Sequence, residues 1–193
     1  MSEIEKIFRS VLNINNADCI REVEEVSTER EYIQGELTVI QGELQHSIPF
    51  IVKGSFLGYY IDSDGKRFTD CVTDFYGCPV TAVSELMNFA KPSEVSFEAL
   101  EDSSVLLVPI ETVVRIVMTY PEVAEAMNRI VLVGFSYHKN FQHLNALPLS
   151  KRYTAFCEFY PELSERLSRT SVAACLNTSI QALSHALSEC EAV

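Results

Sequence analysis

The sequence predicts an α+β fold, in which an N-terminal antiparallel double-stranded β-helix (jelly roll) is followed by a long helix and an all-α C-terminal region. Three observations carry this prediction. Six of the seven glycines lie between residues 35 and 77, where they separate short apolar runs as turns separate strands. Residues 122–147 contain no proline and carry an apolar heptad repeat. Beyond residue 148 the apolar spacing stays helical, in shorter segments.

Length and charge narrow the classes of protein that remain. The 193 residues are 47% hydrophobic, which is enough for one large packed domain or two small ones. The net charge of −12, from 27 acids and 15 bases, excludes a generally basic nucleic-acid coat but not a DNA reader with a small local contact surface. No apolar run approaches the length of a membrane span, and residues 1–10 lack the apolar core of a secretory signal. We therefore expect a cytoplasmic protein without a membrane partner.

The first domain is expected over residues 1–120. The first thirty residues have apolar side chains at helical spacing, and Ile110–Tyr120 is a short helix that ends at Pro121. Asp62–Gly65 has the composition of a hairpin turn, since Asp and Gly tolerate positive φ. Short β-branched, aromatic or alternating segments lie between these features. The predicted strands are Glu36–Gln41, Phe50–Lys53, Phe56–Ile61, Arg67–Phe75, Val95–Leu100 and Val105–Val108.

The long helix, residues 121–147, would extend for roughly 40 Å. Its apolar residues recur at alternating steps of four and three, which is the repeat of a coiled-coil seam. They are Val123, Met127, Ile130, Gly134, Tyr137, Phe141 and Leu144. The seam extends past what a small β-domain could cover, so we expect a dimerisation helix. An ordinary core helix is the alternative.

The C-terminal region, residues 148–193, contains a segment with the pattern of a helix-turn-helix. Helices are expected at Ser150–Tyr160 and Glu162–Leu167, and the sequence RTSVAACLNTSIQALSHAL follows at residues 169–187. Ala173 is small enough for a helix crossing, and Asn177 tolerates the left-handed conformation of a tight turn. Ser179 is a suitable N-cap for the second helix. The predicted inward-facing residues are Val172, Leu176, Leu183 and Ala186.

The outward side of the second helix carries the candidate DNA-reading residues. Serine and glutamine side chains bond base edges, and histidine bonds a base or a phosphate. The candidates are Ser179, Gln181, Ser184 and His185. The second helix contains no Lys or Arg, although residues 149–193 carry a net charge of only −1 (four bases, five acids). A helical hairpin that no longer binds DNA is therefore the alternative.

The order of these parts resembles the Crp/Fnr family of bacterial transcription regulators. The stretches that carry the resemblance are GELTVIQGE at 35–43, FIVKGSFLGYYIDSDGKRFT at 50–69, SFEALEDSSVLLVP at 96–109 and SVAACLNTSIQALSHAL at 171–187. The resemblance implies a homodimer joined by the long helix, with a small-molecule effector cavity inside the β-domain. It implies binding to a palindromic DNA site, with half-sites about 34 Å apart, and RNA polymerase as a partner if the protein activates transcription. The β-hairpin wing of many members is expected to be absent, since the sequence ends at Val193.

The effector pocket implied by this resemblance is degenerate. In members that bind cyclic nucleotides, a glycine–glutamate pair holds the ribose, and an arginine–small–alanine run holds the cyclic phosphate. Gly77 matches the glycine, but Cys78 replaces the glutamate, and the arginine position falls near Glu94. A carboxylate there would repel a phosphate. We expect the pocket at Gly77, Cys78, Glu94, Val95 and Ser96 to take no cyclic AMP in the usual way and to need no cofactor. An unknown small-molecule effector, or none, remains open.

An enzyme has no support in the sequence. There is no Gly-x-Ser-x-Gly, no Walker loop and no Rossmann glycine pattern. No Cys-x-x-Cys or His-Glu-x-x-His is present, so no metal ligands are assigned. We expect a DNA-binding regulator. The alternative is a ligand-sensing or protein-interaction module with a relic helix-turn-helix.

Overall fold

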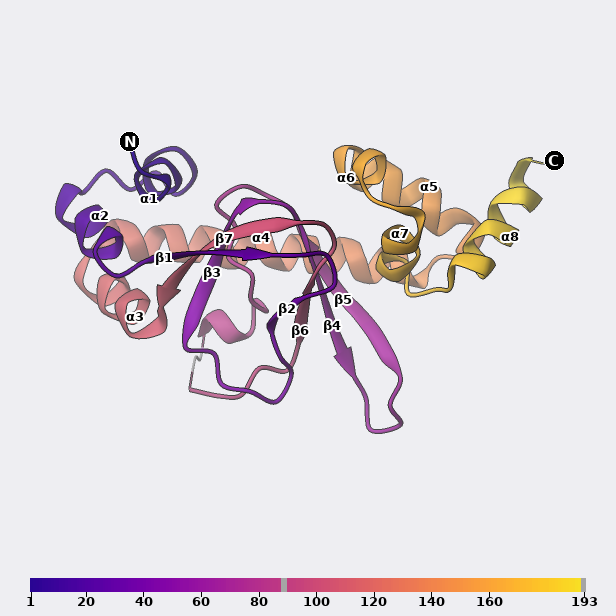
Figure 1. Cartoon of the computed structure of the whole chain (residues 1–193), viewed down its shortest axis with the longest axis horizontal. Coiled ribbons are helices and arrows are strands. Elements are labelled where there is room, and N and C mark those ends of the chain that lie inside the picture. The colour runs from indigo at the N-terminus through magenta and orange to yellow at the C-terminus, as the bar shows by residue number, and fades with distance from the viewer. Residues whose placement is uncertain (88–89, 192–193) are drawn as a thin grey trace.

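A computed structural model of the chain describes residues 1–87 and 90–191. Two antiparallel sheets form a β-roll (Figure 1). Sheet A has the strand order β1–β7–β3, and sheet B has the order β2–β6–β4–β5. The strand bounds are β1 Thr28–Tyr32, β2 Leu37–Val39, β3 Ser47–Lys53, β4 Phe56–Ile61, β5 Arg67–Thr73, β6 Ser96–Ala99 and β7 Ser103–Pro109. The predicted jelly-roll fold and its predicted strands are confirmed.

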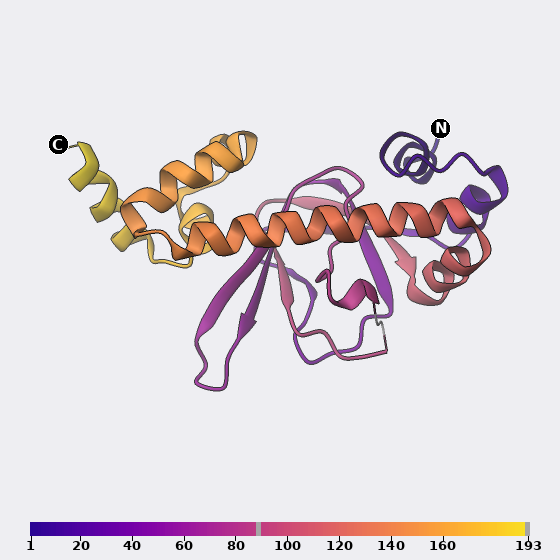
Figure 2. The same cartoon turned by 180° about the vertical axis from the view of Figure 1, so that it is seen from behind.

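Helices gather at both ends of this β-roll (Figure 1). At one end lie α1, a π-helical turn at Ile7–Val11, α2 and α3; at the other lie α5 to α8. Figure 2 shows α4 running along the β-roll from one helical end to the other. The bounds are α1 Glu3–Lys6, α2 Ala17–Glu24, α3 Ile110–Thr119, α4 Pro121–Ala146, α5 Leu149–Phe159, α6 Pro161–Arg166, α7 Arg169–Cys175 and α8 Ile180–Glu191. Val193, the predicted end of the C-terminal domain, lies outside the described residues.

The prediction of helix throughout the first thirty residues was wrong in two places. The helical run breaks after the π-helical turn, where Asn13 has a φ of 57°. Thr28–Tyr32 is a strand instead, which pairs with β7 from Thr28↔Leu107 to Tyr32↔Ser103. Only Tyr32 of this strand is buried. An edge strand with exposed side chains on both faces has no period-two apolar signal, so the sequence pattern could not identify it.

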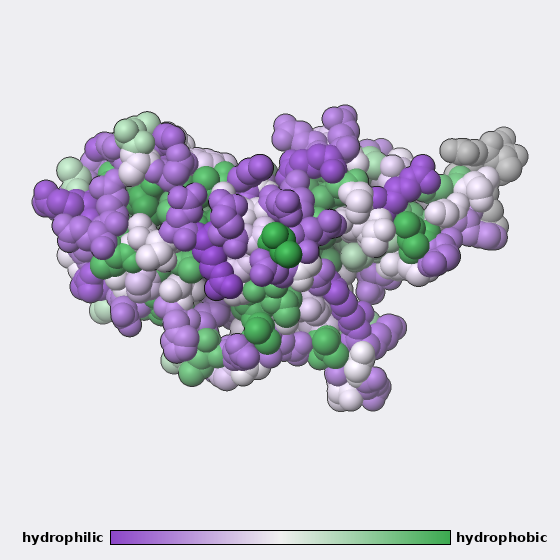
Figure 3. All heavy atoms as spheres, in the orientation of Figure 1, coloured by the Kyte–Doolittle hydropathy of each residue, from purple (hydrophilic) through white to green (hydrophobic). Residues whose placement is uncertain are grey.

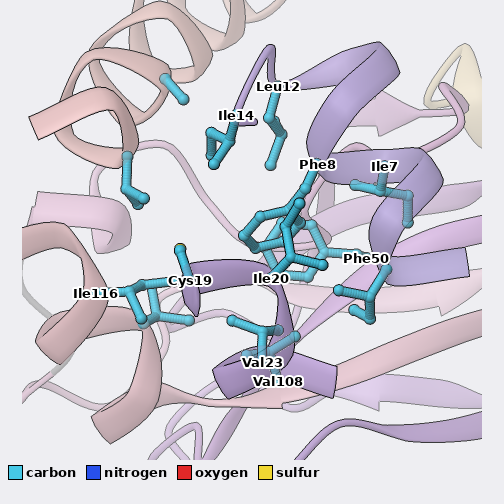
Figure 4. Packing of buried hydrophobic residues seen from close by; sticks show 14 of the residues in the cluster. Ile7, Phe8, Leu12, Ile14, Cys19, Ile20, Val23, Phe50, Val108 and Ile116 are labelled. Atoms are coloured by element: carbon cyan, nitrogen blue, oxygen red, sulfur yellow. The ribbon is translucent and has the colours of Figure 1, made fainter. Parts of the chain in front are cut away.

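Three buried clusters hold the parts together. The first joins the N-terminal helices to α3, the start of α4 and sheet A; Figure 4 shows Phe8, Ile20 and Val108 converging in it. The second fills the space between the two sheets, around Phe56 and Phe97. The third joins the C-terminal helices to the end of α4 and to Leu57, Val72 and Leu100 of the β-roll. The β-roll and the C-terminal helices therefore share one apolar core.

Gly134 allows α4 to approach the β-roll closely. A Cβ atom at this position would lie 2.4 Å from a methyl carbon of Val83. Any side chain would therefore push α4 away from the segment that joins β5 to β6. No described helix is both long and apolar enough to cross a membrane. Hydrophilic side chains cover most of the face in Figure 3, with hydrophobic patches interrupting them over the β-roll.

Candidate functional site

The predicted helix-turn-helix is formed by α7 and α8. Asn177 lies in the turn with a φ of 52°, in the left-handed region expected for it. The Ala182 N–H donates to Oγ of Ser179 at 3.1 Å, so Ser179 caps α8 as predicted. Ala173, at the expected crossing, is buried, and so are the four predicted inward-facing residues. The local chemistry of the turn therefore produces the expected helix pair.

The side chains predicted to read DNA share the outer side of α8. Ser179, Gln181, Ser184 and His185 are all exposed. Gln181, Ser184 and His185 are three and four positions apart, which places them on one helix face. In Figure 1, α8 lies at the extreme end of the molecule, beyond α5 and α7. The structure therefore presents the four candidates together on a protruding helix.

Few cations accompany this surface. Arg152 donates to the main-chain oxygens of Leu147 and Leu176, at 2.8 and 3.1 Å. Arg166 pairs with Glu101 at 2.9 Å. The other two basic residues of the C-terminal region, Lys151 and Arg169, are exposed. Phosphate contacts from this module would rest mainly on these two side chains and on main-chain N–H groups.

Helix α7 is held against the β-roll by hydrogen bonds as well as by the shared core. Oγ1 of Thr69, in β5, donates to the Ala174 carbonyl at 2.9 Å. Oγ of Ser171 donates to the Leu100 carbonyl at 3.3 Å and accepts from Nε2 of Gln34 at 3.1 Å. The position of the helix-turn-helix is thus tied to β5 and to the β6–β7 turn.

A cavity of about 1000 Å³ lies between the β-roll and α4. Its wall is formed mainly by β5, the segment from Phe75 to Leu86, the two residues before β6 and α4 from Ala126 to His138. Four of the five predicted pocket residues line it: Gly77, Cys78, Glu94 and Val95. Ser96, the fifth, is not among the lining residues. Its Oγ accepts from the Gln41 N–H at 2.9 Å, which joins the start of β6 to the residues that follow β2. The assignment of Ser96 to the pocket was therefore wrong.

The cavity wall is mostly apolar, with a few ionisable groups. Burial raises the pKa of Cys78 to about 12 and that of Cys71 well above its ordinary value, so both thiols stay protonated at neutral pH. Burial also raises the pKa of Asp70, and the nearby His138 opposes this shift. Nδ1 of His138 lies 3.5 Å from the Asp70 carboxylate. The sequence pattern gave no signal for the Asp70–His138 pair, because β5 and α4 bring together two residues that are 68 positions apart.

Cations that a cyclic phosphate would need are not gathered in the cavity. Lys66, Arg67 and Lys91 are not among the lining residues. Arg67 pairs with Glu98 at 3.1 Å and lies over the ring of Tyr59. Arg129 lines the cavity and donates to the Leu12 carbonyl at 2.6 Å. Within the described residues, no group of three or more His, Cys, Asp or Glu side chains could hold a metal ion.

The predicted dimer seam is partly buried within the chain itself. Val123, Phe141 and Leu144 are at most 5% exposed and lie in the chain's own core clusters. Met127, Ile130 and Tyr137 are partly buried against the same clusters. The exposed apolar residues of α4 are Leu132, Val133 and Phe135, at 68%, 53% and 55% exposure. The prediction that Val123, Phe141 and Leu144 contact a partner was wrong, because these three side chains pack in this chain's own core. For the partly buried Met127, Ile130, Gly134 and Tyr137, contact with a partner stays a prediction.

Comparisons with known proteins give the fold a context. No family model and no curated protein matches the sequence. Among solved structures, the c-di-GMP-responsive global regulator CLP of Xanthomonas campestris aligns with a TM-score of 0.73 at 15% identity, covering 92% of each chain. A protein of Eubacterium rectale, described as a Crp/Fnr-family transcriptional regulator, aligns at 0.75 and 16%, covering 95% of this chain and 87% of that one.

FixK2 of Bradyrhizobium japonicum aligns with a TM-score of 0.65 at 21% identity, covering 86% of this chain and 85% of that chain. These alignments include the β-roll, the long helix and the C-terminal helices together, because each covers most of both chains. The first two of these proteins are described as regulators. Over nearly its whole length, the chain has the fold of the Crp/Fnr transcription regulators.

Proposed function

We propose that this chain is a dimeric DNA-binding transcription regulator that reads its site with α8. The observation that carries the proposal is the exposed row of Ser179, Gln181, Ser184 and His185 on a helix whose turn and cap have helix-turn-helix geometry. The regulator fold of the whole chain supports it. DNA, a palindromic site and a second copy of the chain are the proposed partners, with RNA polymerase added if the protein activates transcription.

We place the dimer contact on the outer face of α4. Leu132 and Phe135 are exposed and three positions apart, so they lie on one face of the helix, and Phe135 also lines the cavity. A large exposed apolar surface on a long helix is typical of a protein contact. Two copies joined there would carry two α8 helices, and a two-fold axis would match them to half-sites about 34 Å apart.

The cavity between β5 and α4 is proposed as the effector site. Its volume of about 1000 Å³ is at the upper end of small-molecule pockets. Asp70 lines the cavity, and the adjacent Thr69 holds the Ala174 carbonyl of α7, so a ligand that moves β5 would also move α7. No effector is identified by this geometry, but the lining supports one other than cyclic AMP in its usual mode.

The test is a selection of DNA fragments from the source genome by the purified full-length protein, at low and at physiological salt. A regulator should enrich a palindrome with two spaced half-sites. Since Lys151 and Arg169 are the main exposed cations, a dimer should lose affinity with a slope of roughly −4 in log K against log salt. Failure to enrich any sequence with folded, dimeric protein would contradict DNA reading.

The variant Gln181→Ala tests whether α8 reads the bases of the DNA site. A bidentate glutamine contact contributes about 1–3 kcal/mol of discrimination at one base pair. We expect Gln181→Ala to relax the preference at one position of each half-site and to leave the other positions unchanged. Gln142→Ala, an exposed glutamine on α4, is the matched control and should keep the full preference. An unchanged preference in Gln181→Ala would remove Gln181 from the reading surface.

A second candidate function is a ligand-sensing or protein-interaction module with a relic helix-turn-helix. The absence of Lys and Arg from α8, and the internal contacts of Arg152 and Arg166, favour it. Such a module should bind no DNA even at the lowest salt, where a regulator binds most tightly. The same selection therefore separates the two candidates.

A further inference from the structure

Glu85 is a buried carboxylate next to the cavity. It lies in the short helical turn Glu85–Met87, between β5 and β6, and is 7% exposed. Its Oε1 accepts from the main-chain N–H of Glu94 at 2.8 Å. Oγ of Ser93 lies 2.8 Å from the same Oε1 and 2.7 Å from the Val95 carbonyl, so these two acceptors share its one hydroxyl proton. Its Oε2 lies 3.3 Å from Oγ1 of Thr81. The three donors converge on one carboxylate from two separate segments of the chain.

Gln45 completes the donor set around Thr81. Its Oε1 is 3.0 Å from Oγ1 of Thr81, while its Nε2 is buried and has no hydrogen-bond partner among residues 1–87 and 90–191. The oxygen and nitrogen of an amide are assigned from the hydrogen-bond network. The opposite orientation lets Gln45 donate to Thr81, which satisfies the orphaned nitrogen. The single Thr81 hydroxyl proton is then directed to Glu85.

Among the residues that the structure describes, no cation takes part in this arrangement. Within the described part of the chain, no ion pair includes Glu85, and the donors are two hydroxyl groups and one main-chain N–H. Convergent neutral donors of this kind form a nest that binds an oxyanion of any origin. Thr81 and Glu94 line the cavity, and Ser93 and Glu85 are buried directly behind them, so the nest adjoins the cavity wall.

We propose that Thr81, Ser93 and the Glu94 N–H form an oxyanion-binding nest and that Glu85 is its built-in occupant. Glu85 thereby decides which ligands the cavity accepts, because a phosphate or carboxylate group would have to displace it from three hydrogen bonds. The carboxylates of Asp70 and Glu94 in the same wall repel a second anion. If the cavity is the effector site proposed above, its effector carries no phosphate group.

The test is chemical rescue of Glu85→Ala by formate, which is the carboxylate that the substitution removes. Thermal unfolding is measured while formate replaces chloride at constant ionic strength. We expect Glu85→Ala to have a lower Tm than the wild type in chloride and to regain most of the loss in formate, with saturation. Inorganic phosphate is the second probe. The wild type should show no saturable response to formate, phosphate or cyclic AMP.

Two controls separate the nest from a general salt effect. Leu86→Ala removes a neighbouring buried side chain but leaves the nest filled, so formate should not restore its Tm specifically. The double variant Glu85→Ala/Ser93→Ala loses a donor and should be rescued less than the single variant. Equal gains in Glu85→Ala and Leu86→Ala, an unchanged Tm in Glu85→Ala, or full rescue of the double variant would overturn the proposal.

Failure of Glu85→Ala to fold in chloride still gives a result. The readout is then the folded fraction recovered by circular dichroism when formate is added, with Leu86→Ala under the same conditions as the reference. Recovery restricted to Glu85→Ala supports the nest, and no recovery overturns it. A saturable Tm shift of the wild type with cyclic AMP would overturn the proposal that Glu85 keeps phosphate groups out of the nest. None of these measurements contains DNA, so their outcome is independent of whether α8 reads it.

Discussion

At the scale of single residues, Asn177 fixes the turn between α7 and α8. Its φ of 52° lies in the left-handed region, where a Cβ atom approaches the following carbonyl. The Thr178 and Asn177 N–H groups donate to the carbonyls of Ala173 and Ala174, at 3.0 and 3.1 Å, and close the end of α7. The direction in which α8 leaves the domain therefore depends on one residue that tolerates this conformation.

Replacing Asn177 tests this dependence. Asn177→Ala should lower the free energy of unfolding by about 1 kcal/mol, because alanine has no local side-chain hydrogen bond to offset the left-handed conformation. Asn177→Gly should be close to neutral, since glycine has no Cβ. Urea unfolding measures both, with Asn128→Ala on the exposed side of α4 as a control. Equal effects of alanine and glycine would contradict the argument.

Asp74 lies in a protein environment that favours its neutral form. Burial raises the pKa of its carboxyl group above the ordinary value of 3.8; Arg166 opposes this shift, while Glu162 and Glu101 add to it. Its Oδ1 is buried without a hydrogen-bond partner among the described residues. A carboxyl group with a raised folded-state pKa binds its proton more tightly in the folded chain than in the unfolded one.

The raised pKa of Asp74 makes the free energy of unfolding depend on pH. The contribution of Asp74 to stability is fully present below its unfolded pKa and is lost as the pH rises through its raised folded pKa. Asp74→Asn should therefore be more stable than the wild type at neutral pH, and the difference should disappear toward pH 4. Urea unfolding across this range measures it, and Asp64→Asn in the exposed β4–β5 turn is the control. A destabilised Asp74→Asn at neutral pH would refute the argument.

At the scale of elements, α4 has two apolar faces. Most of the heptad residues pack in the chain's own clusters, whereas Leu132 and Phe135 are exposed, and Phe135 also lines the cavity. The sequence spacing could predict the helix, its length and an apolar stripe, but periodicity does not identify what covers the stripe. The other strands were predictable because their apolar alternation or their flanking turn residues are visible in the sequence. Strand β1 was not predictable because it exposes nearly all its side chains.

The outer face of α4 is tested by charge. The double variant Leu132→Glu/Phe135→Glu should convert a dimer into a folded monomer, because four carboxylates would meet across the two-fold axis. Size-exclusion chromatography with light scattering measures the mass. Met118→Glu, at an 83% exposed position on α3, is the control and should stay dimeric. A double variant that remains dimeric would place the contact elsewhere. Phe141→Glu, by contrast, should unfold the chain, since Phe141 is fully buried.

At the scale of the whole molecule, the candidate site depends on long-range placement. The exposed residues of α8 were predictable because their spacing, the turn and the cap are all local. The cavity was predictable only at Gly77, Cys78, Glu94 and Val95, through the family resemblance. Asp70, His138 and Glu85 were not identified, because the groups that give them a role come from distant segments: β5 and α4 for the pair, and residues 81, 93 and 94 for the nest.

The shared core predicts how the molecule unfolds. Leu100 lies in the β6–β7 turn, is 4% exposed and packs in the cluster that contains Phe156, Leu163 and Leu176 of the C-terminal helices. Because one cluster serves both regions, we expect a single urea transition, with circular dichroism and tyrosine fluorescence coincident. Leu100→Ala should shift that whole transition by about 2–5 kcal/mol.

Leu37→Ala, at a 37% exposed position on β2, is the matched control and should shift the transition much less. Two separate transitions, with Leu100→Ala moving only one, would mean that the C-terminal helices fold independently of the β-roll. The hydrogen bond from Thr69 to Ala174 would then transmit little from the cavity to α7. A single transition makes the helix-turn-helix part of the same cooperative unit as β5, which is the physical requirement for a ligand in the cavity to change the position of α8.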